Sequence, residues 1–279
     1  MYNSKITKMK TSKILMILLL SAGMVACKQQ KKNNNENAMD ETPEVPKEAS
    51  KDPIKLTKLE GSPSYADAAL MLRSPEDGKI TDGSAVNFAF NVNNYELGAQ
   101  TTGPNSELLA NSGKGQHIHF ILNNQPYSAH YEPEFSKELP DGVHHLVAFL
   151  SRSYHESVKN ENSVVVRKLE VGQNPKDSLG LDIEAPTLIY SRPKGEYSGQ
   201  DTENLMLDFF VLNTTLSENG NKVRAIINGE EFMITEWAPH IMKGLPMGEV
   251  TIQLELVDKE GNLIPGPFNQ VKRTVILKE

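Results

Sequence analysis

The chain has 279 residues and a formal net charge of −7, with 36 acidic against 29 basic side chains. This acidic balance argues against nucleic acid as a partner, because phosphate backbones are bound through basic surfaces. The chain has one cysteine, Cys27, which excludes an intramolecular disulfide and a thiolate cluster. The fold must therefore be held together by its apolar core.

The first 26 residues have the three-part layout of a secretory signal. Four lysines and no acidic residue precede the apolar run 14–20, and small residues then lead to Ala26 and Cys27. The apolar run is shorter than the roughly 20 residues of a membrane-spanning helix. Residues 24–27 resemble the lipobox of bacterial lipoproteins. The resemblance implies cleavage before Cys27 and lipidation of that cysteine, whereas the alternative is an uncleaved anchor with an incidental cysteine.

A lipidated Cys27 places the protein outside the cytoplasm, anchored to a bacterial membrane. We expect the outer membrane, on its periplasmic face or at the cell surface. Removal of residues 1–26 would take away four lysines and lower the net charge to −11. Residues 27–55 are rich in Lys, Gln, Asn, Glu and Pro, and they cannot bury enough apolar surface to offset their ordering entropy. We predict a disordered tether there.

The rest of the chain contains two copies of one pattern, about 118 residues apart. Four landmarks recur in the same order, each with a similar sequence. The matched ranges are 70–75 with 188–193, 86–94 with 205–213, 117–124 with 222–229, and 139–142 with 245–248. The pattern predicts two modules, 65–172 and 183–279, joined by the polar Gly/Pro stretch 172–180.

Within each copy the apolar segments are short, rich in β-branched and aromatic residues, and bounded by Gly, Pro and Asn. Residues 250–256 alternate apolar and polar side chains, which is typical of a strand with one buried face. No segment after residue 27 has a sustained helical period. The sequence therefore predicts an all-β protein of two tandem immunoglobulin-like β-sandwich domains.

Histidine is distributed very unequally between the two copies. The second copy has only His240, while the first has the other six, namely His117, His119, His130, His144, His145 and His155. Imidazole is a common ligand of copper and zinc. The imbalance therefore points to a metal site in the first copy, whereas a hydrogen-bonded or solvated histidine pair is the alternative.

The second copy predicts which way these side chains point. Its alternation, transferred to the first copy, places His117 and His119 on the outer face of one strand and His145 on the same face of a neighbouring strand. These three could share Cu(II) or Zn(II) on an exposed sheet face, with His155 or His130 completing the site. By the same transfer His144 points inward and bonds to the backbone.

Residues 115–124, together with 139–146, are similar to periplasmic β-sandwich domains of unknown function that carry a Gly-x-His-x-His strand, as in Bacteroidetes-like lipoproteins. The resemblance covers about 40 residues and implies the fold rather than an activity. The same strand looks like the copper strand of copper/zinc superoxide dismutase. That family also needs a disulfide, which one cysteine cannot form, so we reject the dismutase interpretation.

No segment carries a strong catalytic motif, so we expect a non-enzymatic binding module. Copper or zinc is the first candidate ligand, and a peptide, a phosphopeptide, a glycan or a plain spacer role is the alternative. Arg152 and Arg192, each beside serine in a turn, could hold an anion or simply support the turn. Trp237 could stack on a sugar or belong to the core.

Overall fold

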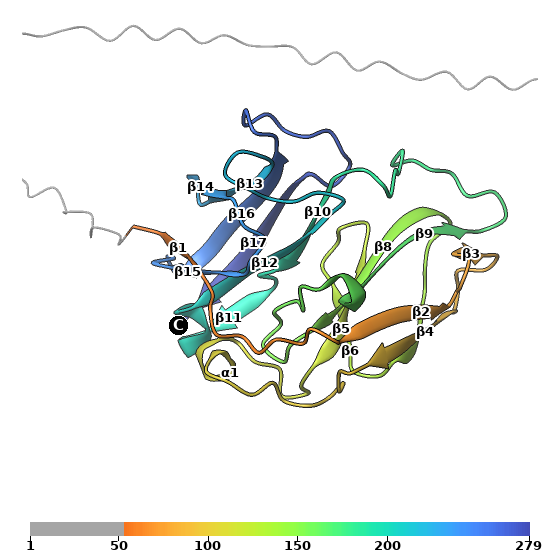
Figure 1. Ribbon diagram of the computed structural model, residues 1–279, viewed down its shortest axis with the longest axis horizontal. Helices are drawn as coiled ribbons and strands as arrows, with labels where there is room; N and C mark the ends of the chain where they lie inside the picture. Colours follow the sequence, from red (N-terminus) through yellow and green to blue (C-terminus); the bar gives the residue numbers. More distant parts are fainter. Residues whose placement is uncertain (1–52) are drawn as a thin grey trace, which may run out of the picture. The chain divides into compact units, whose positions relative to one another are not determined.

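The computed structural model describes residues 53–279, which belong to one compact unit of short strands (Figure 1). The expected signal, Cys27 and almost all of the expected tether lie outside the described residues. In the described part, no helix has the length and apolar content needed to cross a membrane. The all-β prediction is confirmed, because helical elements among residues 53–279 are limited to α1 (Asn105–Leu108), η1 (Glu161–Ser163) and η2 (Gly199–Thr202).

The first sandwich consists of a three-stranded and a five-stranded sheet. The smaller sheet has the order β2 (Ala69–Ser74), β4 (Val86–Asn93), β7 (Glu134–Lys137). The larger sheet has the order β3 (Lys79–Ile80), β9 (Val164–Val171), β8 (Gly142–Ser151), β5 (His117–Leu122), β6 (Ser128–His130).

The second sandwich repeats this plan and adds one strand. Its smaller sheet has the order β1 (Lys55–Lys58), β15 (His240–Lys243), β12 (Leu205–Leu212), β10 (Thr187–Arg192). Its larger sheet has the order β11 (Glu196–Ser198), β17 (Gln270–Lys278), β16 (Gly248–Val257), β13 (Lys222–Ile227), β14 (Glu230–Ile234).

The two larger sheets also agree in register. Phe120 on β5 lies opposite Ala148 on β8, and Ala225 on β13 lies opposite Leu254 on β16. Position by position, this pairing reproduces the alignment of 117–124 with 222–229 that the sequence suggested. The inward side chains of both copies fill their own cores, as the alternation predicts, since Ile118 and Phe120 are buried in the first and Ala225 in the second.

The extra strand β1 comes from the segment just before the first sandwich and pairs with β15 of the second. Ile54 and Leu56 pack into the second core. The tether predicted to end at residue 55 therefore overlaps the start of strand β1. Ile54 and Leu56 alternate with polar residues, so this short segment can bury one face in the second core. The chain thus contributes one strand to the second sandwich before it forms the first sandwich.

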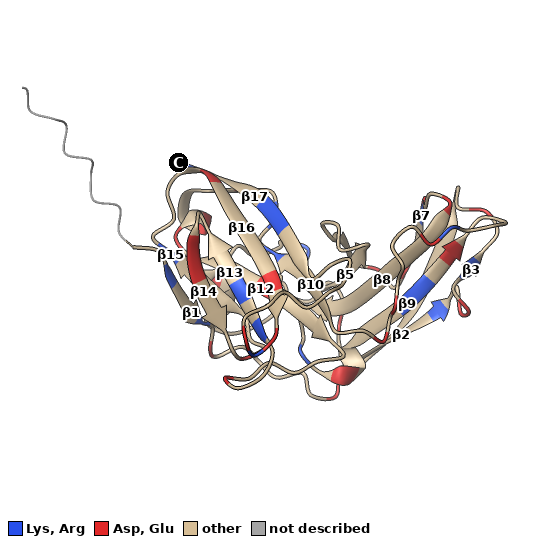
Figure 2. Cartoon of the chain, turned by 90° about the horizontal axis from the view of Figure 1, so that it is seen from above, with Lys and Arg blue, Asp and Glu red and all other residues tan. Residues whose placement is uncertain are grey.

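The outer face of the larger sheet in the first sandwich is covered, not exposed. Side chains from β5, β8 and β9 pack against the outer face of β10 and β12, which belong to the second sandwich; the buried members are Ile121, Tyr127, Val147, Phe149, Ile189, Phe210 and Leu212. Strands β5 and β8 contain no Lys, Arg, Asp or Glu and are uncoloured in Figure 2, whereas β9, β14 and β17 carry charges. The part of the outer face that β5 and β8 form is thus uncharged, and it packs against the second sandwich largely through apolar and aromatic side chains.

Candidate metal centre

Three histidines of the first sandwich converge at this interface. His117 Nε2 lies 3.0 Å from His119 Nε2 and 3.1 Å from His155 Nδ1. One ligand atom from each of the three lies within 4.8 Å of the others. Imidazole nitrogens bound to one ion at about 2.0 Å must lie within roughly 4 Å of one another. The two distances to His117 Nε2 meet that spacing, and the pair formed by His119 and His155 exceeds it by less than 1 Å at most.

The strand and the turn that present these side chains follow from local sequence. His117 and His119 alternate with core residues on β5, so both point away from the first core and toward the second sandwich. His155 lies in the turn after β8 with a φ of +70°, a left-handed conformation that histidine adopts more readily than most residues. Its backbone N–H donates to the Arg152 carbonyl at 2.9 Å, which closes the turn.

The prediction of an exposed metal site was wrong in one respect, because His117 and His119 are completely buried. His155 is half-buried. The alternation correctly gave the face of the sheet on which the pair lies. It could not show that another sandwich covers that face.

Hydrogen bonds set the protonation of the pair. His117 Nδ1 donates to the Gly115 carbonyl at 2.8 Å, so its Nε2 carries the lone pair when the ring is neutral. His119 Nε2 then donates toward that lone pair, and His119 Nδ1 can accept from the Ser191 hydroxyl, 3.3 Å away on β10. A ring nitrogen held by a backbone carbonyl while the other faces the site is the usual arrangement of metal-binding histidines.

All three imidazoles are held neutral. Burial lowers the pKa of His117 to about 4, and it lowers the pKa of His119 and of His155 well below the ordinary value of imidazole, with the positive charges of Arg192 and Lys194 acting in the same direction. Neutral imidazole is the form that binds a metal. At pH 7 each ring therefore carries one lone pair, and His119 offers its lone pair to the cluster in the tautomer whose proton is on Nδ1, toward the Ser191 hydroxyl.

Tyr127 is a neighbour of the cluster that the sequence did not single out. Its ring stacks on His119 with centroids 3.5 Å apart, and its Oη lies 3.2 Å from His155 Nδ1. Arg192 Nη1 donates to this Oη at 2.9 Å, and Lys194 Nζ lies 3.9 Å from the ring centroid. A lone tyrosine in a loop after a strand gives no sequence signal, and only the packing brings it to the histidines.

His145 does not join the three. It lies on the predicted face of β8 but opposite Lys168, several residues along the strand from Phe149, which is the partner of His119. Its ring stacks on Phe268 with centroids 5.5 Å apart, and neither ring nitrogen has a hydrogen-bond partner. Sharing a face of the sheet was necessary for a common site, but position along the strand separates His145 from it.

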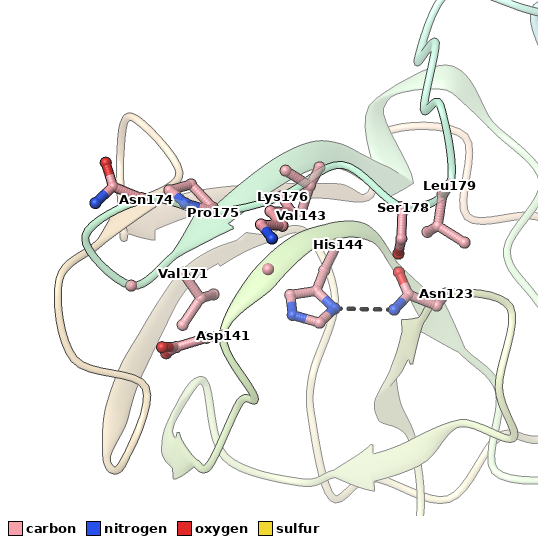
Figure 3. A pocket seen from close by; sticks show the side chains of 12 residues that line it. Asn123, Asp141, Val143, His144, Val171, Asn174, Pro175, Lys176, Ser178 and Leu179 are labelled. Atoms are coloured by element: carbon pink, nitrogen blue, oxygen red, sulfur yellow. Dashed lines mark hydrogen bonds between the residues drawn. The ribbon is translucent and has the colours of Figure 1, made fainter.

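His130 and His144 also lie elsewhere. His130 stacks on Phe135 and pairs with the Ser128 hydroxyl at 2.9 Å. His144 is buried, as predicted, and its Nε2 donates to the Pro140 carbonyl at 2.8 Å. Its Nδ1 lies 2.9 Å from Asn123 Nδ2, beside a hollow of about 380 Å³ along the linker (Figure 3). Both nitrogens of His144 are thus engaged by the protein itself.

The two arginines proposed for anion binding are used internally. Arg152 is buried, pairs with Glu156 at 3.1 Å and donates to the carbonyls of Ser157 and Pro63. Arg192 is buried against Tyr127. Arg152 therefore already has an internal anion in Glu156, and it stabilises the turn that carries His155.

Trp237 is half-buried between the two sandwiches. Its indole N–H donates to the Phe209 carbonyl at 2.9 Å, and its ring packs edge-on against Phe210 with centroids 4.7 Å apart. These contacts agree with the core role weighed for Trp237 in the sequence.

No protein-family model matches the chain, and no curated protein matches it. Among solved structures it is similar to the fibronectin(III)-like modules of CbhA from Clostridium thermocellum, with 14% identity over 75% of this chain and 94% of that chain and a TM-score of 0.26. It is similar to the two tandem V-type regions of VCBP3, a v-region-containing chitin-binding protein, with 8% identity over 76% and 100% of the chains and a TM-score of 0.23.

A third similar structure is SGBP-B of Bacteroides ovatus, solved with a mixed-linkage heptasaccharide. Identity is 12% and the TM-score is 0.21, and the match covers 75% of this chain and 47% of that one. At such TM-scores these likenesses carry no argument about ligand or activity. The sandwich fold rests on the strand order of the chain itself.

Proposed function

We propose that the protein is a non-enzymatic binding module that holds one copper or zinc ion between its two sandwiches, through His117, His119 and His155. The observation that carries the proposal is the convergence of three neutral ring nitrogens, one per residue, within 4.8 Å. Without an ion, two ring nitrogens are directed at the single lone pair of His117 Nε2. A cation at that point would use all three lone pairs at once, with the ring protons of His119 and His155 moved to their other nitrogens.

Copper and zinc are favoured over magnesium and calcium by the ligand type. The cluster offers nitrogen alone, and imidazole suits copper and zinc, whereas magnesium and calcium require oxygen ligands. Two of the three histidines are completely buried, and the third is half-buried. This supports a role in holding an ion, or in being stabilised by it, rather than in hydrolysis.

Metal binding is tested on the full chain with Cys27→Ser, which removes the only thiol. We expect one Cu(II) or Zn(II) per chain by elemental analysis and calorimetry. His117→Ala with His119→Ala should weaken binding by at least about 100-fold, since even second-shell changes cost 10- to 100-fold. His145→Phe is the matched control, because it removes a buried histidine from the same sheet face but not from the cluster.

The double variant could lose metal simply because the interface opens. His155→Asn covers this case, since His155 is half-buried and asparagine also tolerates positive φ. It should fold, with an unchanged circular dichroism spectrum, and bind metal at least about 10-fold more weakly. Stoichiometric metal with unaltered affinity in both variants would show that the histidines form a plain hydrogen-bonded cluster, and a peptide, glycan or spacer role would then be the better hypothesis.

We further propose that the module is anchored to a bacterial membrane, outside the cytoplasm, by lipid on Cys27. The support is the lysine-rich start, the short apolar run and the cysteine after Ala26. In a bacterial host the native chain should take up labelled palmitate and sediment with membranes, and Cys27→Ser should do neither. Palmitate labelling of the Cys27→Ser chain would contradict the proposal.

A further inference from the structure

Beyond the three histidines, we propose that Tyr127 is the fourth ligand of the ion, bound through its Oη as phenolate, so that the site is three imidazoles and one phenolate. This inference rests on the proposed metal function. On binding, the phenolic O–H bond breaks, its proton leaves to solvent, and an Oη–metal bond replaces it. No electron is transferred.

Four ligand atoms placed tetrahedrally at about 2.0 Å from an ion lie about 3.3 Å from one another. The distances from His117 Nε2 to the ring nitrogens of His119 and His155 are 3.0 and 3.1 Å. The distance from His155 Nδ1 to Tyr127 Oη is 3.2 Å, which continues the same spacing to a fourth atom. Tyr127 Oη thus has the spacing of a tetrahedral ligand from His155 Nδ1, one of the three ring nitrogens.

The three histidines offer a divalent ion no negative charge. The three imidazoles are neutral, and the charged side chains acting on all three are Arg192 and Lys194. A divalent ion brought beside these cations needs an anion in the buried site, because unbalanced buried charge is costly. Among the described residues, the group of potential ligands contains no carboxylate. A phenolate at Tyr127 would supply the missing negative charge.

Two cationic side chains lie beside Tyr127. Arg192 Nη1 donates to Oη at 2.9 Å, and Lys194 Nζ lies against the ring. Burial raises the pKa of Tyr127 to about 12, while the charge and the hydrogen bond of Arg192 act in the opposite direction and favour the phenolate. Arg192 is on β10 of the second sandwich while the ligands are on the first, so the second sandwich helps to complete the site.

Cu(II) is the probe, because an N/O site binds it at least as tightly as the other divalent first-row metals. Titration of the full Cys27→Ser chain with Cu(II) should give a phenolate-to-copper charge-transfer band in the visible and enhanced phenolate modes in resonance Raman spectra. Tyr127→Phe keeps the ring that stacks on His119 and removes only Oη. It should still bind copper, more weakly, with both signatures lost.

Tyr131→Phe is the matched control. Its ring lies 5.0 Å from that of His117, but its hydroxyl pairs with Ser112 rather than with the cluster. It should keep the band. The proposal is overturned if the copper-loaded chain has no phenolate band or if Tyr127→Phe retains it. A chain that binds no copper at all would instead overturn the proposed function, and the two failures are therefore distinct.

Discussion

The two sandwiches share strand order and register but bury opposite outer faces. In the first, the outer face of the larger sheet is covered, and His119 lies opposite Phe149 with ring centroids 5.2 Å apart. At the equivalent place in the second, Arg224 lies opposite Glu255, and the two form an ion pair on a partly exposed face. One backbone plan thus carries an aromatic and imidazole interface in one copy and a charged surface in the other.

In the smaller sheets, the outer face is covered in the second sandwich and exposed in the first. On β12 of the second sandwich, the outward residues Asp208 and Phe210 are buried under the first sandwich. On β4 of the first, the outward residues Asn87 and Asn91 are exposed. The histidine-rich copy has a candidate metal centre because the second sandwich covers its outer face. Burial keeps the imidazoles neutral and holds the ligands in place.

Breaking the buried ion pair across the interface should have the largest effect. Asp208 is fully buried and pairs with Lys159, and it accepts from the backbone N–H and hydroxyl of Ser157. Asp208→Ala should lower the free energy of unfolding by about 3–5 kcal/mol in urea denaturation, because it leaves a largely buried ammonium unpaired. The exposed pair of Lys58 and Glu236 is the control, and Glu236→Ala should cost at most about 1 kcal/mol. Equal effects would mean that the interface does not hold the sandwiches together.

Removing an interface aromatic should have the next largest effect. Phe149 is completely buried and stacks on Phe210 across the interface with centroids 4.7 Å apart. Phe149→Ala should lower the free energy of unfolding by about 3–4 kcal/mol, from lost burial and the cavity left behind. Gln253, on the solvated outer face of the second copy, should change stability by no more than about 0.5 kcal/mol when replaced by alanine. A loss below 1 kcal/mol for Phe149→Ala would contradict a packed interface.

The smallest expected effect is a pH dependence that the covered face alone should show. Burial lowers the pKa of His145 from 6.5 to about 4. Between these values the unfolded chain binds the proton and the folded chain does not, so the free energy of unfolding falls as pH drops from 6.5 toward 4. In His145→Phe, measured with chelator present, the loss between pH 7 and 4.5 should be about 2 kcal/mol smaller than in the unsubstituted chain.

Thr251 occupies the position equivalent to His145 in the second copy, on the face that is not covered. Thr251→His should therefore add little pH dependence, since a solvated imidazole keeps an ordinary pKa in both states. If both variants respond alike to pH, burial of the first copy's outer face is not the cause.

Short-range pattern was enough to determine the repeat, the main strands and the faces on which His117, His119, His144 and His145 lie. Alternation along a strand is a local property, so the inward positions of Ile118 and Phe120 could be read directly from the sequence. The outward face of His117 and His119 followed in the same way. The same reasoning correctly placed His144 inward and bonded to the backbone, and it gave the all-β fold class.

Only the tertiary structure decided what covers that outer face and which side chains meet there. It brought His155 and Tyr127 to the pair, placed His145 against Phe268, and turned the two candidate anion-binding arginines inward. Even strand β1 joined the distant sandwich rather than the nearer one. These contacts join residues far apart in the chain, and the docking of one sandwich on another leaves no periodic trace in the sequence from which they could be predicted.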